Sequence, residues 1–207
     1  MDEAGANTAS ADELAPIRAE LERMLGKCLL QLQAYELLMK AIASDHATSF
    51  AKDDTGTTVR GSRANFERKT LGEVVGHVVG GYFASEGAEM ADRPDIYPDF
   101  GPVLSVRVQI TVSDDEFSEM KARLKEFVAL RNTLVHQFLA MHDLSSVAGC
   151  RAALLVLETT STQIDQHITE ARTWLQSLVE TKKYAAEVFD PEAFVLWLNE
   201  RRKASDA

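Results

Sequence analysis

The sequence predicts an all-α protein, an up-and-down helical bundle of about five helices with a small β insertion. Three observations support this fold class. Several long stretches repeat apolar residues every three or four positions, two sites have the spacing of a capping box at a helix start, and strict two-residue alternation of apolar residues occurs in only one segment. We therefore expect one helical domain over residues 12–203, with a loop at 45–69 and a β-containing insertion at 92–113.

The first predicted helix follows a small, polar N-terminus, residues 1–11, which we expect to be disordered. From Leu14 to Ile42, apolar residues recur at alternating spacings of three and four, which is typical of an amphipathic helix. Additional leucines, including Leu30 and Leu37, widen the apolar stripe. They predict that this helix packs against more than one neighbour.

Thr70 and Glu73 have the spacing of a capping box, in which each side chain bonds the other residue's backbone N–H, so they predict the start of a second helix. That helix carries glycines at intervals of four, at Gly72, Gly76 and Gly80. Because a glycine face lacks side chains, we expect close approach of another helix, either within the chain or across a dimer interface.

A single strand is predicted where apolar and polar residues alternate over 104–112. A lone strand needs a partner. We expect that partner to be the irregular segment 92–102, or the same strand of a second copy across a dimer axis.

Two further long helices complete the predicted bundle. A second capping box, Ser113 with Glu116, opens a helix that continues to about residue 141, and the next helix spans about 146–186. Asp190 followed by Pro191 is typical of a helix start, so a short, apolar last helix is expected there.

Composition limits the classes of function. The net charge of −10 argues against a broad nucleic-acid-binding surface, which is normally basic. The two cysteines, Cys28 and Cys150, lie in apolar helical patterns and are expected to be buried and reduced. The acidic N-terminus is unlike a signal peptide, and no apolar run approaches the length of a membrane helix, so a cytoplasmic location without membrane contact is expected.

The segment Arg131 to His136 is the best candidate for chemistry. The sequence has no phosphate-binding glycine loop, no nucleophile-elbow serine and no histidines at metal-ligand spacing, so neither a cofactor nor a metal is expected. On a helix, Asn132 and His136 share a face, whereas Arg131 lies about 140° from His136. Arginine can bind a phosphate through two parallel hydrogen bonds, and histidine can exchange a proton at neutral pH.

This segment resembles the motif of the HEPN superfamily of ribonucleases, in which an arginine, often followed directly by a polar residue, is separated from a histidine by four to six residues. Arg131, Asn132 and His136 match that motif. The resemblance implies a homodimer in which two motifs form one cleft, and metal-independent endoribonuclease activity, often in toxin–antitoxin or phage-defence systems. Some toxins of the superfamily carry a modified tyrosine two residues after the histidine, where this chain has Phe138.

Two functions are therefore predicted. In the first, a dimeric endoribonuclease cleaves single-stranded RNA. His136 transfers protons, Arg131 stabilises charge on the phosphate, and Asn132 orients His136 or a phosphate oxygen. Lys121 and Lys125 guide the RNA. An antitoxin or other regulatory protein is an expected partner. In the second, the chain is a non-catalytic HEPN-like dimeric adaptor or RNA-binding module, and Arg131 and His136 only stabilise a helix end.

Overall fold

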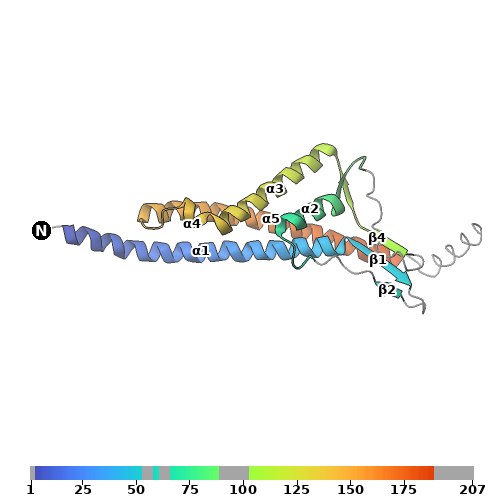
Figure 1. Cartoon of the computed structure of the whole chain (residues 1–207), viewed down its shortest axis with the longest axis horizontal. Helices are drawn as coiled ribbons and strands as arrows, with labels where there is room; N and C mark the ends of the chain where they lie inside the picture. Colours follow the sequence, from blue (N-terminus) through green and yellow to red (C-terminus); the bar gives the residue numbers. More distant parts are fainter. Residues whose placement is uncertain (1–2, 53–57, 61–65, 89–102, 189–207) are drawn as a thin grey trace, which may run out of the picture.

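The computed structural model describes residues 3–52, 58–60, 66–88 and 103–188. Three long helices form the bundle: α1 (Glu3–Asp45), α3 (Asp114–His136) and α5 (Val147–Val188). Figure 1 shows α1 and α5 side by side along the whole molecule, with α3 across them and running in the opposite direction. The chain therefore runs up, down and up, and the predicted all-α bundle with a small β insertion is confirmed.

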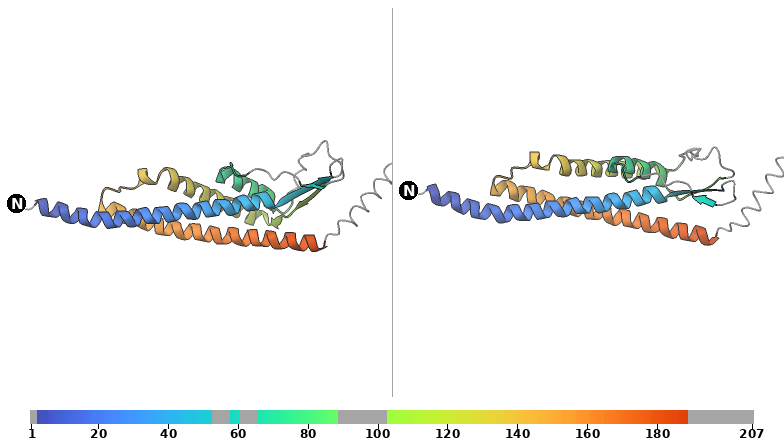
Figure 2. Two further views of the ribbon diagram at one scale, coloured as in Figure 1. Left: turned by 90° about the horizontal axis from the view of Figure 1, so that it is seen from below. Right: turned by 60° about the horizontal axis from the view of Figure 1, so that its bottom comes forward.

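The parallel direction of α1 and α5 follows from contacts between them. The Cys28 thiol donates to the carbonyl oxygen of Leu157 at 3.6 Å, and Lys182 donates to the carbonyl oxygen of Asp45 at 3.0 Å. The contact that lies later along α1 thus also lies later along α5. Figure 2 shows the same pairing from two further sides, with the N-terminal end of α1 extending past the start of α5.

Both predicted capping boxes are confirmed. Thr70 caps α2 (Leu71–His77), and Ser113 caps α3, each with reciprocal side-chain and backbone bonds to the glutamate three residues later. After His77 the backbone continues as a π-helix, η1 (Val78–Tyr82). The helix predicted to reach residue 141 instead stops at His136 and resumes as the short α4 (Phe138–Met141).

The β structure differs from the prediction of one strand. In the described residues the strands are β1 (Ala47–Lys52), β2 (Thr58–Arg60), β3 (Phe83–Ser85), β4 (Val103–Arg107) and β5 (Ile110–Val112). Strand β1 pairs antiparallel with β2 and β4, and β3 pairs parallel with β5. The predicted strand is therefore two strands in two different sheets.

The partners of these strands also correct the prediction. Among the described residues, they come from the expected loop 45–69 and from the end of the glycine-bearing helix. Val108 leaves the first sheet and donates its N–H to the carbonyl oxygen of His46 at 2.8 Å. The alternation of apolar residues continues through this break, so the sequence pattern hides the change of partner.

The N-terminus is a further correction, because α1 begins at Glu3 rather than after residue 11. Alanines at 4, 6 and 9 favour helix, and the helix is already propagated by the apolar stripe that follows. The predicted last helix from Asp190 and the part of the insertion at 92–102 lie outside the described residues.

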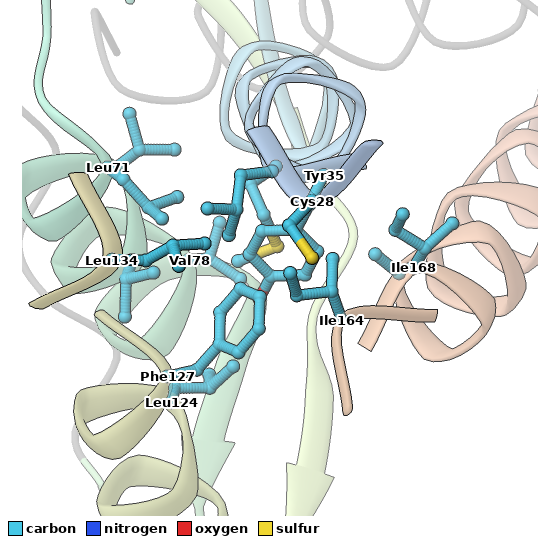
Figure 3. Packing of buried hydrophobic residues seen from close by; sticks show 14 of the residues in the cluster. Cys28, Tyr35, Leu71, Val78, Leu124, Phe127, Leu134, Ile164 and Ile168 are labelled. Atoms are coloured by element: carbon cyan, nitrogen blue, oxygen red, sulfur yellow. The ribbon is translucent and has the colours of Figure 1, made fainter. Parts of the chain in front are cut away.

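The core forms where α1, α2, η1, α3 and α5 converge. Figure 3 shows Phe127 of α3 reaching beneath Tyr35 of α1, and the two rings meet edge to face with centroids 4.6 Å apart. Each fully buried large apolar side chain contributes about 1.5–3 kcal/mol to folding. Cys28 and Cys150 are buried here as free thiols, as predicted.

The glycine face of α2 and η1 is only partly covered within the described chain. A Cβ on Gly72 would meet Val128 at an ordinary 3.7 Å, and nothing lies within 4 Å of a Cβ on Gly76 or Gly80. The expectation of close helix approach inside the chain is therefore wrong for this glycine face. The apolar stripe of α1 does pack against more than one neighbour, as predicted, because α1 contacts α2 and η1 as well as α5, but Leu30 and Leu37 themselves are exposed. Among the described helices, none is long and apolar enough to cross a membrane.

Candidate active site

The candidate motif occupies the last two turns of α3. Leu124, Phe127 and Leu134 hold the inner face of this helix in the core. The helix ends at His136 because Gln137 leaves helical geometry (φ −122, ψ −11) while its N–H still bonds the carbonyl oxygen of Thr133. His136 is thus the last helical residue, at the surface of the bundle.

The three motif residues are accessible to a ligand. Asn132 and His136 are exposed, and Arg131 is half-buried. The Arg131 guanidinium donates from Nη1 to the Asn132 side-chain oxygen at 3.1 Å. Within the described residues no carboxylate pairs with Arg131, so its positive charge is available to a phosphate.

Arg131 and His136 do not contact each other in the described chain. Their five-residue separation directs them about 140° apart around an ideal helix. One motif can therefore hold a phosphate and a proton carrier on neighbouring faces but not against the same atom. A reaction that needs both groups on one phosphate requires a second motif.

Lys121, Lys125, Asn132 and His136 lie on one face of α3, because their spacings of four, seven and four match whole helical turns. All four side chains are exposed. The C-terminal end of a helix carries partial negative charge. The two lysines and Arg131 must therefore supply the positive potential that an RNA phosphate needs.

Apolar side chains surround the motif. Val135 is 41% exposed, and on α4 Leu139 and Met141 are 72% and 62% exposed. An exposed apolar patch around polar residues is typical of a surface that contacts another molecule.

A second group of polar side chains, absent from the sequence-based prediction, lies between the helices. We call Tyr35, Arg123, His167 and Glu170 the inner polar cluster. Arg123 of α3 donates to Glu170 of α5 at 3.0 Å, and His167 Nδ1 lies 3.9 Å from the other oxygen of the same carboxylate. The His167 ring also packs 4.1 Å from that of Phe127.

Three polar atoms of the inner polar cluster are buried with no hydrogen-bond partner in the described chain: Tyr35 Oη, His167 Nδ1 and Glu170 Oε2. Burial raises the pKa of Tyr35 above its usual range. Burial also lowers the pKa of His167, opposed by the nearby Glu170 carboxylate. The sequence holds only a weak trace of this cluster, the His167–Glu170 pair three residues apart on one helix.

His46 is a third histidine in a defined environment, at the junction of α1 and β1. Its Nδ1 lies 2.9 Å from the Ala43 carbonyl oxygen, and burial lowers its pKa. A Cβ on Gly81 would lie only 2.5 Å from His46 Nε2, so a larger residue at that position would displace the His46 ring. These contacts serve the packing of the sheet against η1.

No three histidine, cysteine, aspartate or glutamate residues within the described ranges are grouped so that they could hold a metal ion. Comparison of this chain with protein-family models, with curated protein sequences and with solved structures finds no match.

Proposed function

We propose that this protein is a metal-independent endoribonuclease that cleaves single-stranded RNA at a composite site formed by two copies of the chain. The observation that carries the proposal is the state of Arg131, which is held beside Asn132 and is not neutralised by any described carboxylate. The exposed His136 lies on the same helix, one turn from Asn132.

The chemistry uses the ribose 2′-hydroxyl as the nucleophile. His136 of one copy accepts the proton of that hydroxyl while its oxygen forms a bond to phosphorus. The bond from phosphorus to the 5′-oxygen breaks, and this oxygen receives a proton from the protonated His136 of the other copy. Arg131 stabilises the negative charge that builds up on the phosphate oxygens.

The homodimer is proposed because one copy cannot direct Arg131 and His136 at the same phosphate. A two-fold axis next to the end of α3 brings Arg131 of one copy towards His136 of the other. The exposed Leu139 and Met141 beside the motif supply apolar surface for such a contact.

The role of Lys121 and Lys125 is to guide the RNA backbone along α3 to the motif. Their local positive charge would act within a chain of net charge −10. A toxin–antitoxin or phage-defence setting, with an antitoxin or other regulatory partner, is proposed only from the resemblance of the motif to HEPN ribonucleases.

The proposal is tested by incubating the full chain with single-stranded RNA and with DNA of the same sequence, in EDTA. We expect RNA cleavage with 2′,3′-cyclic phosphate and 5′-hydroxyl ends, and intact DNA, because DNA lacks the attacking hydroxyl. A requirement for a divalent cation, or products with 5′-phosphate ends, would contradict the roles of Arg131 and His136.

The second candidate function is a non-catalytic dimeric adaptor or RNA-binding module. The acidic net charge and the exposed apolar residues on α4 favour it. It predicts a dimer that leaves many different RNAs intact even at high protein concentration, whether or not it binds them.

A further inference from the structure

The outer face of α1 carries a second apolar stripe whose two leucines the bundle leaves exposed, while Ala34 at its inner edge also packs against the core. Leu30 and Leu37 are 68% and 69% exposed, and the half-exposed Ala34 and Ala41 continue their line. The spacings of four, three and four match the a and d positions of a helix–helix seam. The core-facing residues of α1, such as Tyr35 and Met39, are fully buried on the other side.

This stripe, which we call the outer seam (Leu30, Ala34, Leu37 and Ala41), borders an open groove between α1 and α5. The groove holds a cavity of about 370 Å³ lined by Leu30, Ala34, Ile168 and charged residues of α5. Alanines leave room for another backbone, and burial of the two exposed leucines would favour association. The outer seam therefore has the form of a docking surface for a helix.

Charge distribution identifies the occupant. Asp165 and Arg172 lie on the α5 side of the groove, two turns apart, just as Leu30 and Leu37 are two turns apart on α1. Both pairs are centred at the same level, because Gln31 of α1 donates to Asp165 at 2.6 Å and Ala34 shares the cavity with Ile168.

A two-fold axis that crosses both helices at this level makes the surface complementary to itself. It places Leu30 against Leu37 of the second copy and Asp165 against Arg172 of the second copy, with α1 antiparallel to α1. A parallel arrangement would instead set the leucines of α1 against the charged face of α5. Only the antiparallel arrangement matches apolar with apolar and acid with base.

We propose that a second copy of this chain docks on the outer seam through an isologous, antiparallel α1–α1 contact. This contact goes beyond the proposed function, since α3 with its motif packs on the core-facing side of α1, through the Phe127–Tyr35 contact. The seam contact leaves both motifs exposed. If the motif faces also pair, the two contacts together build an assembly larger than a dimer.

The seam is tested with the full chain by light scattering and sedimentation over a range of concentrations. Leu37→Asp should lower the mass of the assembly twofold, because it buries a charge against Leu30 of the second copy. Tyr184→Asp is the matched control, with a tyrosine 68% exposed on α5 and distant from the cavity, and it should leave the mass unchanged. Circular dichroism should show that both variants remain folded, since neither side chain is in the core.

A charge exchange tests the geometry. Arg172→Asp sets two aspartates against each other, and it should weaken association about tenfold or more at low salt. The double variant Asp165→Arg with Arg172→Asp restores opposite charges and should return most of the affinity. An unchanged mass in Leu37→Asp, a wild-type chain that stays monomeric at tens of micromolar, or no rescue by the double variant would overturn the seam. A wild-type chain that assembles through the seam but cuts no RNA would leave this inference standing and remove the proposed function.

Discussion

The inner polar cluster and the Arg131 motif each contain an arginine and a histidine, but the cluster pairs its arginine with a carboxylate and largely buries its histidine, whereas in the motif the arginine pairs with no described carboxylate and the histidine is accessible. In the inner polar cluster, Arg123 donates to the Glu170 carboxylate at 3.0 Å, and the His167 side chain is only 14% exposed. In the motif, Arg131 contacts the neutral Asn132 and His136 is exposed. Both arginines belong to α3, two turns apart.

The difference separates a structural pair from a candidate catalytic pair. A carboxylate that already neutralises an arginine competes with any incoming phosphate, so Arg123 is suited to holding α3 against α5. Arg131 has a neutral neighbour, which fixes the guanidinium without cancelling its charge. Loss of the motif should therefore affect activity, and loss of the inner polar cluster or its ring contacts should affect stability.

The largest expected effect is on catalysis. His136→Ala and Arg131→Ala should each lower the rate of RNA cleavage by about 10²–10⁴-fold. The first removes the group that transfers protons, and the second removes the fixed positive charge beside the reacting phosphate. Cleavage rates under single-turnover conditions measure this loss.

The same two variants should keep the free energy of unfolding within about 0.5 kcal/mol of wild type, since exposed or half-exposed residues contribute little to the core. Urea denaturation provides the measurement. A variant that unfolds, or that loses several kcal/mol, would show that the motif only stabilises the end of α3.

Phe127→Ala tests the other side of the comparison. Phe127 is 2% exposed and contacts both Tyr35 and His167, so its removal leaves a cavity and should cost about 3–5 kcal/mol in the free energy of unfolding. The matched control is the exposed neighbour Glu126→Ala, which should change stability by less than about 0.5 kcal/mol. Equal stabilities for the two variants would contradict the position of Phe127 in the core.

Tyr35→Phe should act in the opposite direction. The Tyr35 hydroxyl is buried with no hydrogen-bond partner in the described chain, and an unpaired buried polar group costs about 1–3 kcal/mol. Removal of the oxygen keeps the ring contact with Phe127, so the variant should be more stable than wild type by urea denaturation. A less stable variant would mean that the hydroxyl has a bonding partner in solution.

Most of the helical fold could be predicted from the sequence, because long periodic stretches and two capping boxes are local signals. The β structure could not. Strand β3 has three residues, too few for a visible period, and the alternation from Leu104 to Val112 crosses a change of sheet without interruption. The glycine face was misjudged because spacing reveals which residues share a face but not what lies opposite.

The motif could be identified from the sequence because its residues lie within one helical segment. The inner polar cluster could not, because Tyr35 and His167 are brought together only by the packing of α1 on α5. The same holds for the outer seam, because its leucines continue the spacing of the core stripe although they are exposed. Contacts between distant segments carry little signal in one sequence.

The smallest expected effect concerns pH and the buried histidine of the inner polar cluster. Burial lowers the pKa of His167 below its ordinary value of about 6.5, so the unfolded chain binds this proton first as the pH falls. The resulting stability is fully present above the unfolded pKa and is lost as the pH falls towards the lower folded pKa. For one histidine, the change in the free energy of unfolding with pH cannot exceed about 1.4 kcal/mol per pH unit.

His167→Gln should therefore flatten the loss of stability between pH 7 and pH 5, measured by urea denaturation at several pH values. Some slope should remain, because burial also lowers the pKa of His46. Glu170→Gln should act oppositely, because the Glu170 carboxylate raises the pKa of His167. Without it the pKa of His167 is lower still, so the loss of stability should extend to lower pH values. Tyr35→Phe keeps the histidine and should keep the wild-type slope. If His167→Gln and wild type lose stability in parallel as the pH falls, His167 is not buried and neutral beside Phe127. It would then not differ from the exposed His136 in the way described above.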